Sequence, residues 1–136
     1  PMKDGSIRKN PFTGEAVTAN DLILGMKQII ERAHAHGIKI FGATMTPYKG
    51  ASYFTPGGEV VREAVNDWIR SGGAFDGVID FDAAVRDPKD PEKYRDDYQT
   101  GDYLHPNAAG YQAMASAINI GELRALSAKS PERVAK

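Results

Sequence analysis

A carboxylate and a histidine lie three residues apart in the segment Asp102-Tyr103-Leu104-His105-Pro106. At this spacing the Asp102 carboxylate can fold back within one turn of chain and accept a hydrogen bond from the Nδ1–H group of His105. Such a bond fixes the tautomer of the imidazole and leaves Nε2 free to take a proton from a hydroxyl nucleophile. The residue types and their spacing therefore indicate acid–base chemistry at His105, with Asp102 orienting the ring.

The elements that must position this pair can be read from the sequence on either side. Thr18 opens a capping-box pattern that predicts a first helix, which Gly37 ends. Two β-prone runs, at 38–44 and 77–81, enclose a second predicted helix at 59–70. This alternation of helices and strands is typical of an α/β protein with a parallel sheet.

A last helix is predicted to begin near Asn107, directly after the Asp102–His105 pair, with Tyr111 and Ile118 on its inner face. Trp68 falls on the apolar stripe of the second helix and is predicted to lie in the core.

Polar stretches rich in glycine and proline separate these elements. Residues 1–17, 45–58 and 82–101 are predicted to be loops, and residues 127–136 a tail. Two short strands with three helices do not make a self-sufficient α/β sandwich, because a parallel sheet needs covered faces and neighbouring strands. We therefore expect residues 1–136 to be the C-terminal part of a single larger domain, completed by a partner segment.

The composition excludes several classes of function. The chain has 136 residues with 17 basic and 18 acidic side chains and a net charge of −1, which argues against nucleic acid or an anionic membrane as partner. The absence of cysteine excludes disulfides and thiol chemistry. No apolar run approaches the roughly 18 residues of a membrane span, and no signal-peptide pattern is present in the sequence. The compartment is left open.

The region around the Asp102–His105 pair resembles the last conserved block of the SGNH (GDSL-type) hydrolases. The shared pattern is Asp102-x-x-His105-Pro106-Asn107-x-x-Gly110-Tyr111. The resemblance extends over about residues 18–120. Its further matching segments are residues 37–40, 44–48, 62–69, 75–82 and 87–88.

This resemblance implies a flavodoxin-like three-layer α/β/α sandwich with a parallel sheet, of which this chain supplies the C-terminal strands and helices. It also implies ester hydrolysis through an acyl-enzyme, with no cofactor and no metal ion. His105 would be the general base and later the general acid, and Asp102 would orient it. Small acyl esters, such as acetylated sugars or short-chain esters, are the expected substrates, and lipid esters stay open.

The sequence lacks the family's Gly-Asp-Ser and Gly-x-Asn-Asp blocks, which supply the nucleophilic serine and part of the oxyanion hole. We therefore expect this chain to be inactive alone. An N-terminal segment of the same gene product, or self-association, would supply the missing part. The alternative is a catalytically incomplete fragment or degenerate hydrolase fold that acts as a binding module.

Other side chains suggest further sites. Tyr48 and Tyr53 lie in a loop after the C-terminal end of a predicted strand, where α/β proteins place ligands, so they are predicted to line the substrate site. Plain loop packing is the alternative for both. His34 and His36 do not share a helix face, which favours a solvated helix end over a metal site.

An acidic cluster and the serines complete the candidates. A solvated loop with turns and caps explains the cluster better than a Ca²⁺ or Mg²⁺ site for metal-dependent hydrolysis. Its members are Asp80, Asp82, Asp87, Asp90, Asp96 and Asp97. No serine has a nucleophile-elbow context, and Ser52 alone lies near a predicted strand end. The other serines are Ser6, Ser71, Ser116, Ser127 and Ser130.

Overall fold

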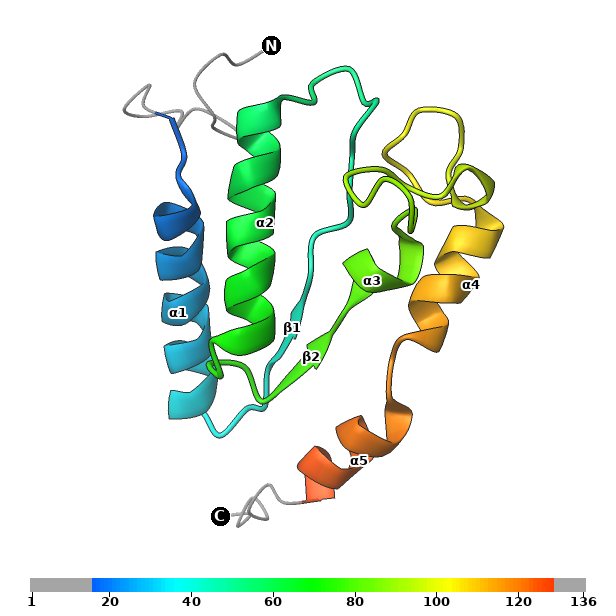
Figure 1. Ribbon diagram of the computed structural model, residues 1–136. Coiled ribbons are helices and arrows are strands. Elements are labelled where there is room, and N and C mark those ends of the chain that lie inside the picture. The colour runs from blue at the N-terminus through cyan, green and yellow to red at the C-terminus, as the bar shows by residue number, and fades with distance from the viewer. Residues whose placement is uncertain (1–15, 129–136) are drawn as a thin grey trace.

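Two short parallel strands lie at the centre of the computed structural model, which describes residues 16–128 (Figure 1). The elements along the chain are α1 (Ala19–Ala35), β1 (Phe41–Ala43), α2 (Pro56–Ser71), β2 (Gly77–Ile79), α3 (Phe81–Val85), the 3-10 helix η1 (Asp96–Tyr98), α4 (Ala108–Ser116) and α5 (Ile120–Ala128). Figure 1 shows α1 and α2 together on one side of the sheet and α3, α4 and α5 on the other. The predicted α/β architecture with a parallel sheet is confirmed.

Helix α1 has the predicted ends. The Thr18 hydroxyl accepts the backbone N–H of Asp21 at 3.2 Å, and the Asp21 carboxylate accepts the N–H of Thr18 at 2.8 Å. This reciprocal capping box satisfies two N–H groups that the first turn leaves without partners. At the other end, Gly37 adopts φ +68°, a conformation that glycine reaches without a Cβ clash.

Helix α2 begins three residues earlier than its predicted range of 59–70. Thr55 is its N-cap, and the Thr55 hydroxyl accepts the N–H of Gly58 at 3.0 Å. Pro56 fits the first turn because no N–H is needed there and its φ is already helical. The segment was predicted as loop because of its proline and glycines, which here belong to the helix start.

Both strands are shorter than the predicted runs 38–44 and 77–81, since the ladder covers three residues on each. The Asp76 carboxylate accepts the N–H of Ile40 at 2.9 Å, where a longer ladder would require a strand partner. The N–H of Ile40 thus goes to a side chain, while its carbonyl still accepts the backbone N–H of Asp76 at 3.0 Å.

The predicted loop at 82–101 is wrong in part, because it contains most of α3 and all of η1. Asp80 caps α3 by accepting the N–H of Ala83 at 3.0 Å. Helices of three to five residues are too short to show a periodic apolar pattern, which explains why sequence analysis did not find them.

The C-terminal region also differs from its prediction. One helix was expected to reach Ile118, but α4 ends before it and α5 follows Asn119, whose side chain accepts the N–H of Glu122 at 3.1 Å. The predicted tail at 127–136 is wrong for its first two residues, which are helical. The rest of that tail, and residues 1–15 of the predicted N-terminal loop, lie outside the described residues.

The core is small. Its buried apolar side chains are Ile30, Tyr48, Ala51, Val65, Ile69, Val85 and Tyr94. Trp68 was expected in the core but is only half-buried. Its ring lies edge-on to that of Phe75, with the two ring centroids 5.6 Å apart. Several large apolar side chains are exposed, namely Leu24, Ile29, Ile38, Tyr53, Val60, Tyr111 and Ile120. No helix within residues 16–128 is both long and apolar enough to cross a bilayer.

Candidate active site

The segment between η1 and α4 carries the predicted pair and is anchored at its end by Asn107. The Asn107 side-chain oxygen accepts the N–H of Gly110 at 3.0 Å and so caps α4. Its Nδ2 donates to the carbonyl oxygens of Asp97 at 2.9 Å and Gln99 at 3.2 Å. The Asn107 side chain therefore joins the start of α4 to η1 and to the loop between η1 and α4.

The Asp102–His105 contact that the spacing predicts is present. Oδ2 of Asp102 lies 2.6 Å from Nδ1 of His105. The second carboxylate oxygen, Oδ1, accepts the N–H groups of Leu104 at 3.0 Å and His105 at 2.9 Å and the Thr100 hydroxyl at 3.0 Å. Both oxygens of Asp102 are thus engaged, and the side chain of His105 is 65% exposed. Since the contact uses Nδ1, the nitrogen left for proton transfer is Nε2.

The electrostatics of this loop keep Asp102 ionised. The hydrogen bond from His105, followed by the backbone N–H groups of His105 and Leu104, holds the pKa of the Asp102 carboxyl well below its usual range. Hydrogen bonds to the charged form are the cause of such a shift. A fixed negative charge beside Nδ1 stabilises the imidazolium that forms when Nε2 takes up a proton.

Tyr103, between the two members of the pair, has a strained backbone with φ +60°. The Gln99 side-chain oxygen holds this conformation by accepting the N–H groups of Gly101 at 2.6 Å and Tyr103 at 3.1 Å. The Tyr103 ring lies against Gly50, where an added Cβ would come within 2.7 Å of it, and the Lys93 ammonium is 5.4 Å from the ring centroid. Sequence analysis missed both Gln99 and Tyr103, because nothing in their local pattern signals these contacts.

Tyr48 and Tyr53 stack with ring centroids 5.7 Å apart and line one mostly apolar pocket of about 160 Å³. Leu104, the neighbour of His105 in the chain, lines the same pocket, as do Met45, Thr46 and Arg62. Tyr48 is buried, which raises the pKa of its phenol, whereas Tyr53 is 52% exposed. The structure brings both predicted tyrosines to the loop that carries the Asp102–His105 dyad (the dyad loop, residues 99–107), and their contact with substrate stays a prediction.

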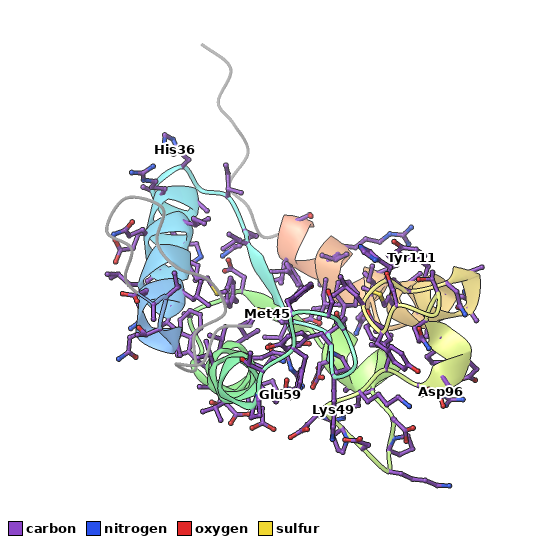
Figure 2. All side chains as sticks on the ribbon, turned by 90° about the horizontal axis from the view of Figure 1, so that it is seen from above. His36, Met45, Lys49, Glu59, Asp96 and Tyr111 are labelled. Atoms are coloured by element: carbon purple, nitrogen blue, oxygen red, sulfur yellow. The ribbon has the colours of Figure 1, made fainter. Side chains whose placement is uncertain are left out.

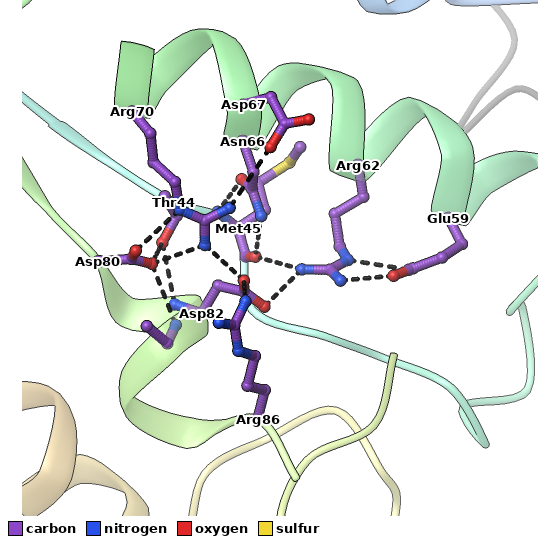
Figure 3. Close-up of polar contacts among 11 residues, drawn as sticks. Thr44, Met45, Glu59, Arg62, Asn66, Asp67, Arg70, Asp80, Asp82 and Arg86 are labelled. Atoms are coloured by element: carbon purple, nitrogen blue, oxygen red, sulfur yellow. Dashed lines mark hydrogen bonds and ion pairs between the residues drawn. The ribbon is translucent and has the colours of Figure 1, made fainter. Parts of the chain in front are cut away.

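A buried ionic network lies beside this pocket and was missed by sequence analysis (Figure 3). Arg62 donates to Glu59 through Nε at 2.9 Å and to Asp82 through Nη1 at 2.7 Å, and these three side chains are at most 5% exposed. Arg70 donates to Asp82 at 2.6 Å and to Asp80 at 2.8 Å, and its hydrogen bonds lower the pKa of Asp80 to about 2. The prediction of a solvated acidic loop is therefore wrong for Asp82. Glu59 and Arg62 lie three residues apart, a spacing that is also common for ion pairs on exposed helix faces. Sequence analysis therefore did not identify the network.

The other members of the acidic cluster lie near the surface with cations or backbone donors. Asp90 pairs with Lys49 at 3.0 Å, Asp96 with Lys93 at 2.8 Å and Asp97 with Arg95 at 2.8 Å, while Asp87 accepts the N–H of Lys89 at 2.8 Å. Within residues 16–128, no three histidine, aspartate or glutamate side chains come together in a group that would hold a metal ion.

The two histidines of α1 lie apart from the dyad. His34 Nε2 is 2.8 Å from Asp76, which also binds Lys39 at 3.1 Å. His36 is exposed at the end of α1, far from Tyr111 on α4 (Figure 2). The predicted helix-end position is confirmed, although His34 has a carboxylate partner that was not foreseen.

The serines within the described residues are not arranged as nucleophiles. Ser71, Ser116 and Ser127 donate to carbonyl oxygens four residues earlier in their own helices, and Ser52 is exposed in its loop. In residues 16–128, no serine hydroxyl is hydrogen-bonded to His105. Ser6 and Ser130 lie outside the described residues.

Comparison with known proteins identifies the family through a family model and supports the fold through solved structures. The model of the GDSL-like Lipase/Acylhydrolase family matches residues 6–113. Among solved structures, a GDSL-like lipase from Bacteroides thetaiotaomicron is similar at a TM-score of 0.66 and 17% identity, over 83% of this chain and 56% of that one. A putative acylhydrolase from Bacteroides fragilis is similar at a TM-score of 0.64 and 16% identity, over 84% of this chain and 55% of that one. The chain thus spans little more than half the length of either structure. No curated protein sequence matches it.

Proposed function

Because this chain belongs to the GDSL-like lipase/acylhydrolase family, we propose that it supplies the general base of a serine ester hydrolase, with His105 as the base and Asp102 as its orienting carboxylate. The observation that carries the proposal is the 2.6 Å contact between Asp102 Oδ2 and His105 Nδ1, on a carboxylate whose other oxygen is held by three donors.

The reaction follows from this geometry. A serine hydroxyl gives its proton to Nε2 of His105 as its oxygen attacks the ester carbonyl carbon. The proton then moves to the leaving alcohol oxygen as the carbon–oxygen bond breaks, which leaves an acyl-enzyme. Water then attacks the acyl carbon and gives a proton to Nε2, and this proton moves to the serine oxygen as the acyl–oxygen bond breaks, which releases the acid and the free serine. Throughout, Asp102 holds the Nδ1–H and stabilises the imidazolium.

The serine is proposed to come from a further segment that bears the Gly-Asp-Ser motif, since the printed sequence contains none. This chain matches only 56% and 55% of the two structures that resemble it, which leaves room for such a segment. A segment of the same gene product is the proposed source, and a second copy of the chain is the other.

The substrate is proposed to be an ester with a small acyl or alcohol part, such as an acetylated sugar. The pocket beside Leu104 has a volume of about 160 Å³ and a mostly apolar lining, which suits a short chain or one ring face. The exposed ring of Tyr53, stacked on Tyr48, offers an aromatic surface for such a group.

Labelling with a fluorophosphonate tests the proposal, because only an assembled serine–histidine–aspartate site reacts quickly with it. The natural polypeptide that contains this chain should be labelled and should hydrolyse nitrophenyl acetate, whereas His105→Ala should lose both by about 10⁴-fold or more. Absence of labelling in a folded wild-type protein would favour the alternative, a binding module with the hydrolase fold.

A further inference from the structure

Met45, the second residue beyond the end of β1, is held by side chains of α2. The backbone N–H of Thr44 still donates to the Ile79 carbonyl of β2, at 3.1 Å. At Met45 a side chain takes over, because Asn66 accepts the Met45 N–H at 2.7 Å and donates to the Met45 carbonyl at 2.8 Å. Arg62 Nη1 donates to the same carbonyl at 2.9 Å (Figure 3).

This clamp is stiff because both of its members are buried and held elsewhere. Asn66 is 1% exposed and Arg62 is 4% exposed. The Arg62 guanidinium is fixed by Glu59 on one edge and by Asp82 on another. A buried guanidinium does not leave such partners without stranding their charges, so the position of the Met45 carbonyl is determined from α2.

The clamp sets the direction in which the chain leaves the sheet. Figure 2 shows Met45 near the middle of the molecule, between α2 and the layer that contains α4. The segment that follows supplies Thr46, Tyr48 and Tyr53, which with Met45 make up most of the lining of the apolar pocket beside the dyad loop. A small rotation at Met45 would therefore move the wall of that pocket.

We propose that Asn66 is a positioning residue that, together with Arg62, sets the shape of the pocket for a short apolar group by fixing the backbone of Met45; Arg62 also lines the pocket itself, whereas Asn66 does not. The inference rests on the proposed function, because the pocket is assigned there to the ester substrate. It goes further in placing a determinant of specificity on α2, away from Asp102 and His105.

Binding of n-butanol to the full chain, followed by NMR at the methyl group of Met45, tests this proposal without requiring catalysis. The variant is Asn66→Leu, which is similar in size but lacks both hydrogen bonds. The control is Asp76→Leu, because the Asp76 side chain also accepts a backbone N–H beside β1, that of Ile40 at 2.9 Å, and does not line the pocket. Thermal unfolding of both variants shows whether their losses of stability are comparable.

We expect saturable binding in the wild type, a dissociation constant raised about tenfold in Asn66→Leu, and a change within about twofold in Asp76→Leu. Equal dissociation constants in all three proteins, or no saturable shift at Met45 in the wild type, would overturn the inference. If Asn66→Leu does not fold, Asn66→Asp keeps the acceptor for the Met45 N–H, loses the donor, and should still weaken binding beyond the control.

The two proposals fail in different ways. Expected n-butanol binding without fluorophosphonate labelling would remove the hydrolase assignment and leave the clamp in place. Fluorophosphonate labelling of the wild type, together with unchanged n-butanol binding in Asn66→Leu, would support the hydrolase assignment and remove the clamp proposal.

Discussion

Asp102→Asn is the sharpest test of the dyad, because the structure dictates which way the new amide must face. The site of Oδ1 receives three donors, from Thr100, Leu104 and the backbone of His105. The amide oxygen must occupy that site, since an NH₂ group there would meet donors only. The NH₂ group then takes the place of Oδ2 and donates to Nδ1 of His105.

This arrangement selects the wrong tautomer of His105. With Nδ1 accepting, the ring proton moves to Nε2, which then cannot accept a proton from the serine. A base held in the wrong tautomer costs about 10⁴-fold in turnover, or about 5 kcal/mol of transition-state stabilisation. The fold should be little affected, because the three hydrogen bonds to the Oδ1 site are kept.

Two measurements on the polypeptide that carries its nucleophile check the prediction. Ester hydrolysis gives the loss in kcat, and nitrogen NMR of His105 reports the tautomer independently of activity. Thr100→Val is the matched control, because it removes one donor to Asp102 without reversing the tautomer, and it should cost less than about tenfold. An Asp102→Asn enzyme within about tenfold of the wild type, or one with its proton still on Nδ1, would refute the reasoning.

Three other predictions concern stability. Thr18→Ala removes the capping box of α1 and should lower the free energy of unfolding by about 1 kcal/mol, measured by urea titration; an unchanged value would contradict the cap. Gly58→Ala places a Cβ against the hydroxyl of the buried Tyr48, so it should cost about 1–3 kcal/mol in thermal unfolding and weaken n-butanol binding; unchanged values of both would refute the contact. Asp80 has its pKa lowered from 3.8 to about 2, mainly by hydrogen bonds from Arg70. The unfolded state therefore binds more protons at acid pH, and stability should fall as the pH drops from about 5 to about 2; a flat urea midpoint over that window would contradict it.

What could be predicted from the sequence depends on how far apart the interacting groups lie along the chain. The capping box at Thr18, the helix end at Gly37 and the contact between Asp102 and His105 each involve only a few neighbouring residues. Backbone geometry alone restricts such contacts, so residue type and spacing are informative. The family resemblance likewise rested on the block that contains the pair.

Two of the features that sequence analysis missed depend on long-range contacts. Asp82 is buried because it meets Arg62 and Arg70, twenty and twelve residues away, whereas its own neighbours are those of a polar loop. The ring of Tyr103 occupies the space left by the missing side chain of Gly50, on another loop. Neither partner can be identified from local pattern, because the fold alone brings the two segments together.

The loop from Gln99 to Asn107 has a further consequence. Its geometry is closed by its own side chains: Gln99 holds the turn at Tyr103, Thr100 and the backbone hold Asp102, and Asn107 ties both ends to α4. The proposed base and its orienting carboxylate are therefore held in a fixed position relative to the start of α4. A change in the position of α4 would therefore alter the distance between His105 Nε2 and a nucleophile while the contact between Asp102 and His105 is kept.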